Sequence, residues 1–135
     1  MGADVVLDAR TEDVPARVRE ATGGDGVDVL LEMSGSERAP AGGLQALRNG
    51  GWVSLLGLPS SEVRVDLAAG VIFKGARVAG IFGRRVWQTW EQGTALLRRG
   101  LDVAPVITHR FPLERFEEAF ALLKSGEAGK VILYV

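Results

Sequence analysis

Short apolar runs alternate with longer amphipathic segments along most of the chain. Residues 27–33 (VDVLLEM) are almost continuously apolar, which is typical of a parallel strand covered on both faces. Residues 52–56 (WVSLL) form a second strong strand pattern. The alternation of such runs with helical segments predicts an α/β protein with a parallel sheet.

Weaker strand patterns occur elsewhere. They lie at 4–7 (DVVL), at 130–135 (KVILYV) and in the alternating segment from Ala76 to Phe82. Residues 103–109 contain Pro105, which restricts any strand there to a sheet edge or an irregular conformation.

The helical segments carry recognisable start and stop signals. Asp13 followed by Pro15 suits a helix start, because proline is tolerated in the first turn. Ser34 and Glu37 have the spacing of a capping box, which predicts a helix from there to about residue 47. Gly126 ends the last helix. The predicted helices are 13–22, 34–47, 67–73, 84–99 and 113–125.

Charge and composition exclude several classes of partner. The 135 residues include 16 basic and 17 acidic side chains, for a net charge of −1. Neither sign dominates, so we expect no binding to nucleic acid or to anionic membranes. The apolar runs are far shorter than a membrane span, and the first residues lack the pattern of a signal peptide. The sequence therefore predicts a cytoplasmic protein.

The side chains that usually carry catalysis are scarce. There is no cysteine and only one histidine, His109, which by itself makes neither a catalytic triad nor a zinc site. No G-x-G-x-x-G follows a strand, and there is no P-loop lysine motif. We therefore predict no catalytic residue and no metal ligand in this chain. A structural role is the better interpretation of His109.

Several short motifs, in order along the chain, resemble the medium-chain, zinc-dependent dehydrogenases. They are TGGDGVDV at 22–29, EMSG at 32–35, NGG at 49–51, LGLP at 56–59, LLKSG at 122–126 and GKVIL at 129–133. Narrower motifs are similar to the L-threonine 3-dehydrogenase family. These are VIFKG at 71–75, GIFGR at 80–84, TW at 89–90 and ITHRF at 107–111.

The resemblance implies a partial Rossmann-like, doubly wound parallel sheet. Residues 1–101 would carry the later strands of an NAD-binding domain, without its glycine-rich loop. Residues 102–135 would be a helix and a strand that return to the catalytic domain. The resemblance also implies that NAD is the coenzyme and that the zinc ligands lie outside this chain.

Two segments at strand ends are the main candidates for coenzyme contact. Leu56, Gly57 and Leu58 follow a predicted strand, and ligands of open α/β sheets bind at that edge. By the resemblance, their backbone lines the nicotinamide end of NAD; the alternative is a plain turn before Pro59. Gly80, Ile81 and Phe82 would likewise reach the nicotinamide carboxamide. An apolar strand that pairs subunits explains these three residues equally well.

Two further residues are weaker candidates. The resemblance puts Ser34 near the adenosine, although the capping box explains this serine without any ligand. Arg84 matches a family position and could neutralise pyrophosphate charge, whereas a solvated helix start explains Arg85 better. Core packing on one helix face is the simpler explanation of Trp87 and Trp90.

The resemblance implies oxidation of L-threonine by NAD to 2-amino-3-ketobutyrate and NADH in a zinc-dependent enzyme. We expect the isolated chain to be inactive and to bind NAD weakly or not at all, because the phosphate-binding loop is absent. A homo-oligomer that pairs through the segment from Ala76 to Phe82 is expected. Two alternatives are a fragment of a related polyol or alcohol dehydrogenase, and a non-catalytic, truncated oligomerisation module.

Overall fold

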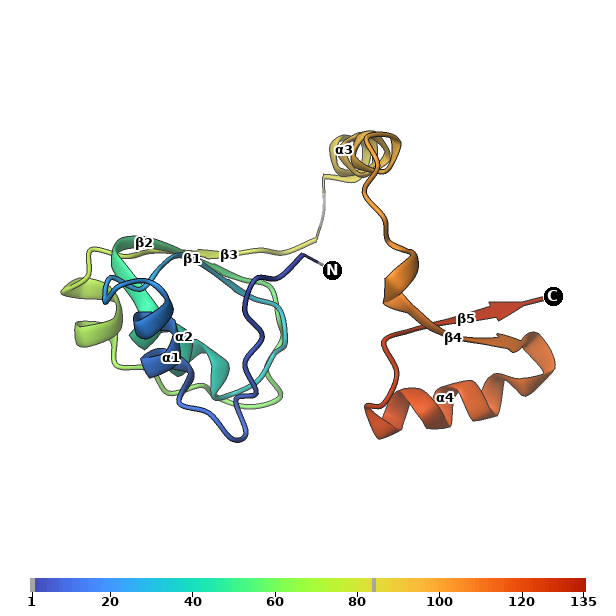
Figure 1. Ribbon diagram of the computed structural model, residues 1–135, viewed down its shortest axis with the longest axis horizontal. Helices are drawn as coiled ribbons and strands as arrows, with labels where there is room; N and C mark the ends of the chain where they lie inside the picture. The colour runs from blue at the N-terminus through green and yellow to red at the C-terminus, as the bar shows by residue number, and fades with distance from the viewer. Residues whose placement is uncertain (1, 84) are drawn as a thin grey trace. The chain divides into compact units, whose positions relative to one another are not determined.

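The computed structural model describes residues 2–83 and 85–135. The chain divides into two compact units, one of residues 3–83 and one made mainly of residues 85–135 (Figure 1). The sequence-based division into 1–101 and 102–135 stays a prediction. The first unit contains α1 (Val14–Ala21), β1 (Val27–Glu32), α2 (Ala39–Ala46), β2 (Leu47–Leu55), the π-helical turn η1 (Ala68–Ile72) and β3 (Arg77–Gly80).

The first unit is built on a parallel sheet, which confirms the predicted α/β fold. Its described strands lie in the order β1-β2-β3, and both pairs are parallel. Glu32 pairs with Leu55, and Leu55 pairs with Gly80. All three strands therefore end together at one edge.

One face of this sheet carries the small core. Leu44 of α2 packs with Leu47 and Val53 of β2, and each of these side chains is less than a tenth exposed. Leu30 of β1 packs against this cluster, while the neighbouring Leu31 is 57% exposed. Successive side chains of a strand point to opposite faces, so α2 covers one face and leaves the other open.

Helix α1 begins and ends as its sequence signals predict. The Asp13 carboxylate accepts a hydrogen bond from the Ala16 amide at 3.1 Å, and proline occupies the first turn. The chain then turns at Gly23 and Gly24, which both have positive φ. Such turns favour glycine because it has no Cβ.

The predicted capping box does not form. Helix α2 begins at Ala39, and its preceding residue makes no side-chain cap. The Ser34 hydroxyl donates instead to the Glu32 carboxylate, and the Glu37 carboxylate accepts from the Ser60 hydroxyl. A nearby carboxylate thus takes the Ser34 hydroxyl, and a residue distant in sequence takes the Glu37 carboxylate, so neither side chain caps the helix.

The predicted strand at 4–7 is also absent. These residues have no strand conformation, and Val5 and Val6 are exposed. An extended segment becomes a strand only when a neighbour pairs with its backbone groups. The sheet pairings of the described residues include none for this segment.

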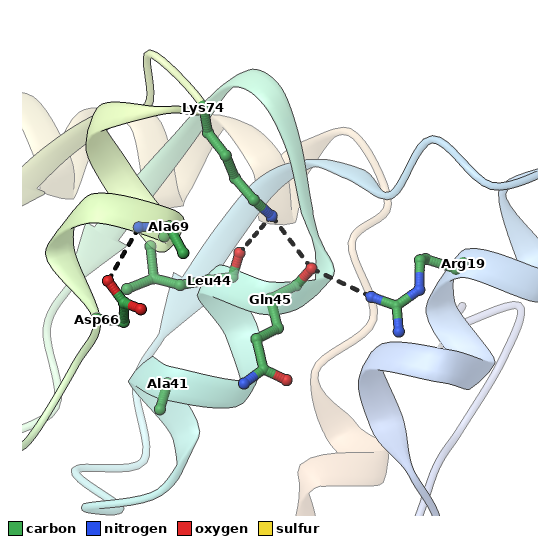
Figure 2. A pocket seen from close by; sticks show the side chains of 8 residues that line it. Arg19, Ala41, Leu44, Gln45, Asp66, Ala69 and Lys74 are labelled. Carbon is green, nitrogen blue, oxygen red and sulfur yellow. Dashed lines mark hydrogen bonds between the residues drawn. The ribbon is translucent and has the colours of Figure 1, made fainter.

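Lys74 joins η1 to the end of α2. Its ammonium group donates to the carbonyl oxygens of Leu44 at 2.7 Å, Gln45 at 3.1 Å, and Leu47, as Figure 2 shows for the first two. Cations suit a helix C-terminus, where carbonyl groups lack intrahelical partners. Burial, with a smaller effect of the nearby Arg19, lowers the pKa of Lys74. The predicted short helix at 67–73 is present as η1 and packs against α2.

The second unit contains α3 (Val86–Arg98), the 3-10 turn η2 (Ala104–Val106), β4 (Ile107–Pro112), the 3-10 turn η3 (Leu113–Arg115), α4 (Phe116–Ser125) and β5 (Lys130–Tyr134). Strands β4 and β5 are parallel, and α4 lies between them in sequence. The predicted final helix is confirmed, including its end at Gly126 with φ of 76°. Pro105 lies in η2, and the regular strand begins only after it.

Candidate functional site

The predicted binding residues of the first unit gather where its strands end. The Leu56 amide donates to the Glu32 carbonyl at 2.8 Å, and the Ile81 amide donates to the Leu55 carbonyl at 2.8 Å. The loops after β1, β2 and β3 therefore begin side by side. We call this the carboxyl edge; it brings together Ser34, Leu56, Gly57, Leu58, Gly80, Ile81 and Phe82. Ligands of open α/β sheets bind at such an edge.

A buried carboxylate organises the carboxyl edge. Glu32 is only 5% exposed, and its Oε1 accepts from the Ser34 amide at 2.9 Å, the Ser34 hydroxyl at 2.5 Å and the Gly35 amide at 3.1 Å. The Ser34 hydroxyl, followed by burial acting the other way and then by backbone amides, holds the pKa of Glu32 below its usual value. The side chain is therefore a carboxylate at neutral pH.

Two glycines let the first two loops meet. A Cβ on Gly57 would overlap the backbone nitrogen of Gly35 and lie 2.5 Å from Glu32 Oε2. A Cβ on Gly35, which has φ of +69°, would lie 2.6 Å from the Leu58 carbonyl oxygen. Any other residue at either position would push the loops apart. Gly57 therefore allows another part of the protein backbone to come close, and its contact with NAD stays a prediction.

The candidate residues differ in what they offer to a ligand. Phe82 is fully exposed, Leu58 is 87% exposed and Ile81 is 47% exposed, so all three present apolar surface at the carboxyl edge. The Ser34 hydroxyl is engaged by Glu32. A cavity of about 250 Å³ lies between the first two loops, lined by Glu32, Gly35, Ser36, Pro40, Leu55, Gly57, Pro59, Val63 and Val65.

The remaining candidates lie outside this constellation. Arg84 lies outside the described residues. His109 belongs to the second unit, where its Nδ1 is 3.0 Å from the Thr108 hydroxyl and its ring stacks near Phe111. Trp87 and Trp90 are 80% and 58% exposed, so the expected core packing is not seen within their own unit.

Metal binding and membrane insertion find no support in the described part of the chain. Over residues 2–83 and 85–135, no group of three or more His, Cys, Asp or Glu side chains could hold a metal ion. Within the same residues, no helix is long and apolar enough to cross a bilayer.

Comparison with known proteins supplies the family. The sequence profile of the zinc-binding dehydrogenases matches residues 1–99, which is most of the chain. The chain belongs to the zinc-binding dehydrogenase family. Among its curated relatives, the L-threonine 3-dehydrogenase of Symbiobacterium thermophilum is 48% identical over 135 residues, and that of Pyrococcus furiosus is 45% identical over 134 residues. Each alignment covers 98% of this chain and 38% of the relative.

Solved structures of alcohol dehydrogenases share the fold. An alcohol dehydrogenase from Thermus sp. ATN1 superposes with a TM-score of 0.88 at 30% identity, covering 99% of this chain and 39% of that one. An alcohol dehydrogenase from Thermotoga maritima gives 0.85 at 33% identity, covering 98% and 38%. This zinc-binding dehydrogenase chain thus spans about 38% of the length of its curated relatives.

Sequence reasoning overlooked Glu32 as an organising residue of this zinc-binding dehydrogenase. Asp28, the other carboxylate of β1, is exposed and pairs with Arg48, so it forms no pair with Glu32. The signal that could have revealed Glu32 is an acidic residue at the end of a mostly apolar strand, two residues before a Ser-Gly pair that can donate hydrogen bonds.

Proposed function

We propose that this chain forms the nicotinamide-side wall of the NAD site in a zinc-dependent oxidoreductase that acts on L-threonine. The reaction would convert L-threonine and NAD to 2-amino-3-ketobutyrate and NADH. The convergence of three strand-end loops at the carboxyl edge carries the proposal. The L-threonine 3-dehydrogenases among the relatives, at 48% and 45% identity, support the choice of substrate.

The exposed side chains at the carboxyl edge fit part of a dinucleotide. Leu58, Ile81 and Phe82 offer apolar surface suited to an aromatic ring, and the Leu56–Leu58 backbone offers peptide groups to a carboxamide. Bound NAD would supply the acceptor for hydride, and these residues would bind and orient its ring and exclude water. The described residues hold no group of three or more His, Cys, Asp or Glu side chains that fits zinc, so another part of the enzyme would supply the zinc ligands.

Two alternatives remain from the sequence. A related polyol or alcohol dehydrogenase would use the same carboxyl edge, and the likeness to two alcohol dehydrogenase structures supports it. A non-catalytic oligomerisation module would use the segment from Ala76 to Phe82, which contains the edge strand β3 and in which Val78 and Ile81 are half exposed. We favour the threonine enzyme because identity to its relatives is the higher.

Calorimetric titration of the purified chain with NAD tests the binding part. We expect weak, saturable binding that Leu58→Ser lowers by about tenfold, since an exposed apolar contact to the ring is lost. Phe73→Ser is the matched control, because Phe73 is 81% exposed and precedes β3 rather than following it. Equal losses in both variants, or no binding by a folded chain, would contradict the proposed coenzyme wall.

A hybrid enzyme tests the reaction. The equivalent 38% of the Symbiobacterium L-threonine 3-dehydrogenase is replaced by this chain, and NADH formation is followed with L-threonine and with simple secondary alcohols. We expect turnover of L-threonine by the hybrid and none by the chain alone. Preference of the hybrid for simple alcohols would favour the alcohol dehydrogenase alternative, and NADH formation by the chain alone would contradict its predicted inactivity.

A further inference from the structure

The buried position of the Glu32 carboxylate is not explained by the proposed contacts of the chain with NAD. A buried carboxylate loses hydration and is retained only where other groups compensate it. Among the ion pairs of the described residues none involves Glu32, so hydrogen-bond donors alone balance its charge. These donors are the amide and hydroxyl of Ser34, the amide of Gly35 and, with the smallest effect, the amide of Gly57.

The same residue also holds the second loop. Its backbone carbonyl accepts from the Leu56 amide at 2.8 Å and from the Gly57 amide at 3.1 Å. Its Oε2 lies beside Gly57, where a Cβ would come within 2.5 Å of it. Glu32 is therefore the common partner of the loop after β1 and the loop after β2.

The charge of the side chain matters for this arrangement. Hydrogen bonds to an ionised acceptor are shorter and stronger than neutral ones, and the Ser34 contact of 2.5 Å is of that kind. An amide in place of the carboxylate would weaken these bonds. It would also direct an NH₂ group at Gly57, whose amide is itself a donor.

We propose that Glu32 is a positioning residue that fixes the spacing between the loop at Ser34–Gly35 and the loop at Leu56–Leu58, so that both halves of one dinucleotide are bound together. The inference rests on the proposed function, in which the second loop faces nicotinamide, together with the resemblance, which implies that Ser34 of the first loop lies near the adenosine. Two subsites held at a fixed spacing bind a linked ligand far more tightly than either half alone.

The test compares NAD with its two halves. The affinities of NAD, AMP and nicotinamide mononucleotide are measured by NMR titration of the wild-type chain and of Glu32→Gln. We expect the variant to bind NAD about tenfold more weakly and each half within about threefold of wild type, because only the spacing is lost. Asp28→Asn is the matched control, since it removes a carboxylate from the same strand at an exposed position, and we expect it to leave all three affinities unchanged.

A purely structural role would give a different pattern. Loss of folded protein lowers the apparent affinity for all three ligands by the same factor, and this result would overturn the proposal. Unchanged binding of NAD by the variant would also overturn it. Should Glu32→Gln fail to fold, Ser34→Ala removes one donor only, and a smaller loss confined to NAD is expected from it.

Amide hydrogen exchange distinguishes failure of the proposed NAD binding from failure of the positioning role of Glu32. In the wild-type chain we expect slow exchange of the Ser34 and Gly35 amides, because both donate hydrogen bonds to the Glu32 carboxylate. In Glu32→Gln we expect these amides to exchange faster. If the wild-type chain protects these amides but binds no NAD, the proposed function fails and Glu32 is only a structural residue. If NAD binds but protection and affinity are unchanged in the variant, the positioning role alone fails.

Discussion

The two compact units differ in how much apolar surface they bury by themselves. In residues 3–83, α2 closes over one face of the sheet, and Leu44, Leu47 and Val53 are buried. Among residues 85–135, only Ala119 of the apolar side chains reaches a comparable burial, and Phe116 and Phe120 of α4 stay about half exposed. Burial of apolar area drives folding, so the first unit has the more independent core.

The two units also differ in how far their charged side chains are exposed to solvent. Glu32 is buried among hydrogen-bond donors, whereas the Arg115–Glu118 ion pair at the start of α4 is more than half exposed on both sides. A buried charge depends on every partner around it, while solvent screens an exposed pair. The carboxyl edge should therefore be sensitive to single substitutions to which the second unit is tolerant.

The largest expected effect is in the core of the first unit. Leu47 is 2% exposed, and Leu47→Ala should destabilise this unit by about 2–5 kcal/mol through lost burial and a cavity. The matched substitution Leu123→Ala, at a side chain 44% exposed, should cost less than about 1 kcal/mol. Urea unfolding of both variants measures the difference. Equal costs would mean that the units share one core.

Glycine substitutions sharpen the contrast. Gly57→Ala inserts a methyl group against the Gly35 backbone and Glu32, and should cost about 2 kcal/mol or more. Gly93→Ala, within α3 and with nothing within 4 Å of the new Cβ, should stabilise its helix by about 1 kcal/mol. Thermal unfolding of the two variants checks the opposite signs, and a tolerated alanine at 57 would contradict the close approach of the loops.

Acid should affect the first unit through Glu32. Hydrogen bonds hold its folded pKa below the unfolded value of about 4.3, so its stabilisation is fully present above that value and is lost as the pH falls through the folded pKa. Urea midpoints measured from neutral pH down to about pH 3 should fall for the wild type and change less for Glu32→Gln. Identical acid profiles would show that other carboxylates account for the loss.

The smallest expected effect is at the exposed ion pair of the second unit. Arg115 donates two hydrogen bonds to Glu118 and lowers the pKa of that carboxyl, yet both side chains are solvated. Glu118→Gln should therefore shift the unfolding temperature only slightly, and less at high salt. A shift comparable with that of Leu47→Ala would contradict the expectation that this exposed ion pair contributes little to stability.

Local sequence patterns accounted for most elements but not for all their boundaries. The apolar run at 27–33 and the amphipathic pattern ending at Gly126 were confirmed as β1 and α4, because hydrophobic periodicity reports burial directly. The capping box failed because the Ser34 hydroxyl is held by the Glu32 carboxylate and the helix begins only at Ala39, beyond its reach. The strand at 4–7 failed because pairing needs a neighbour, which no local pattern specifies.

The sequence by itself determined the α/β rhythm, the family resemblance and the residues that follow each strand, because these depend on local order and residue type. Only the tertiary structure decided that those residues share one edge, since strand register and parallel pairing join segments far apart in the chain. It also decided the role of Glu32. The Ser34 and Gly35 amides that balance its charge are local, but the close packing of Gly57 beside its carboxylate comes from a segment more than twenty residues away.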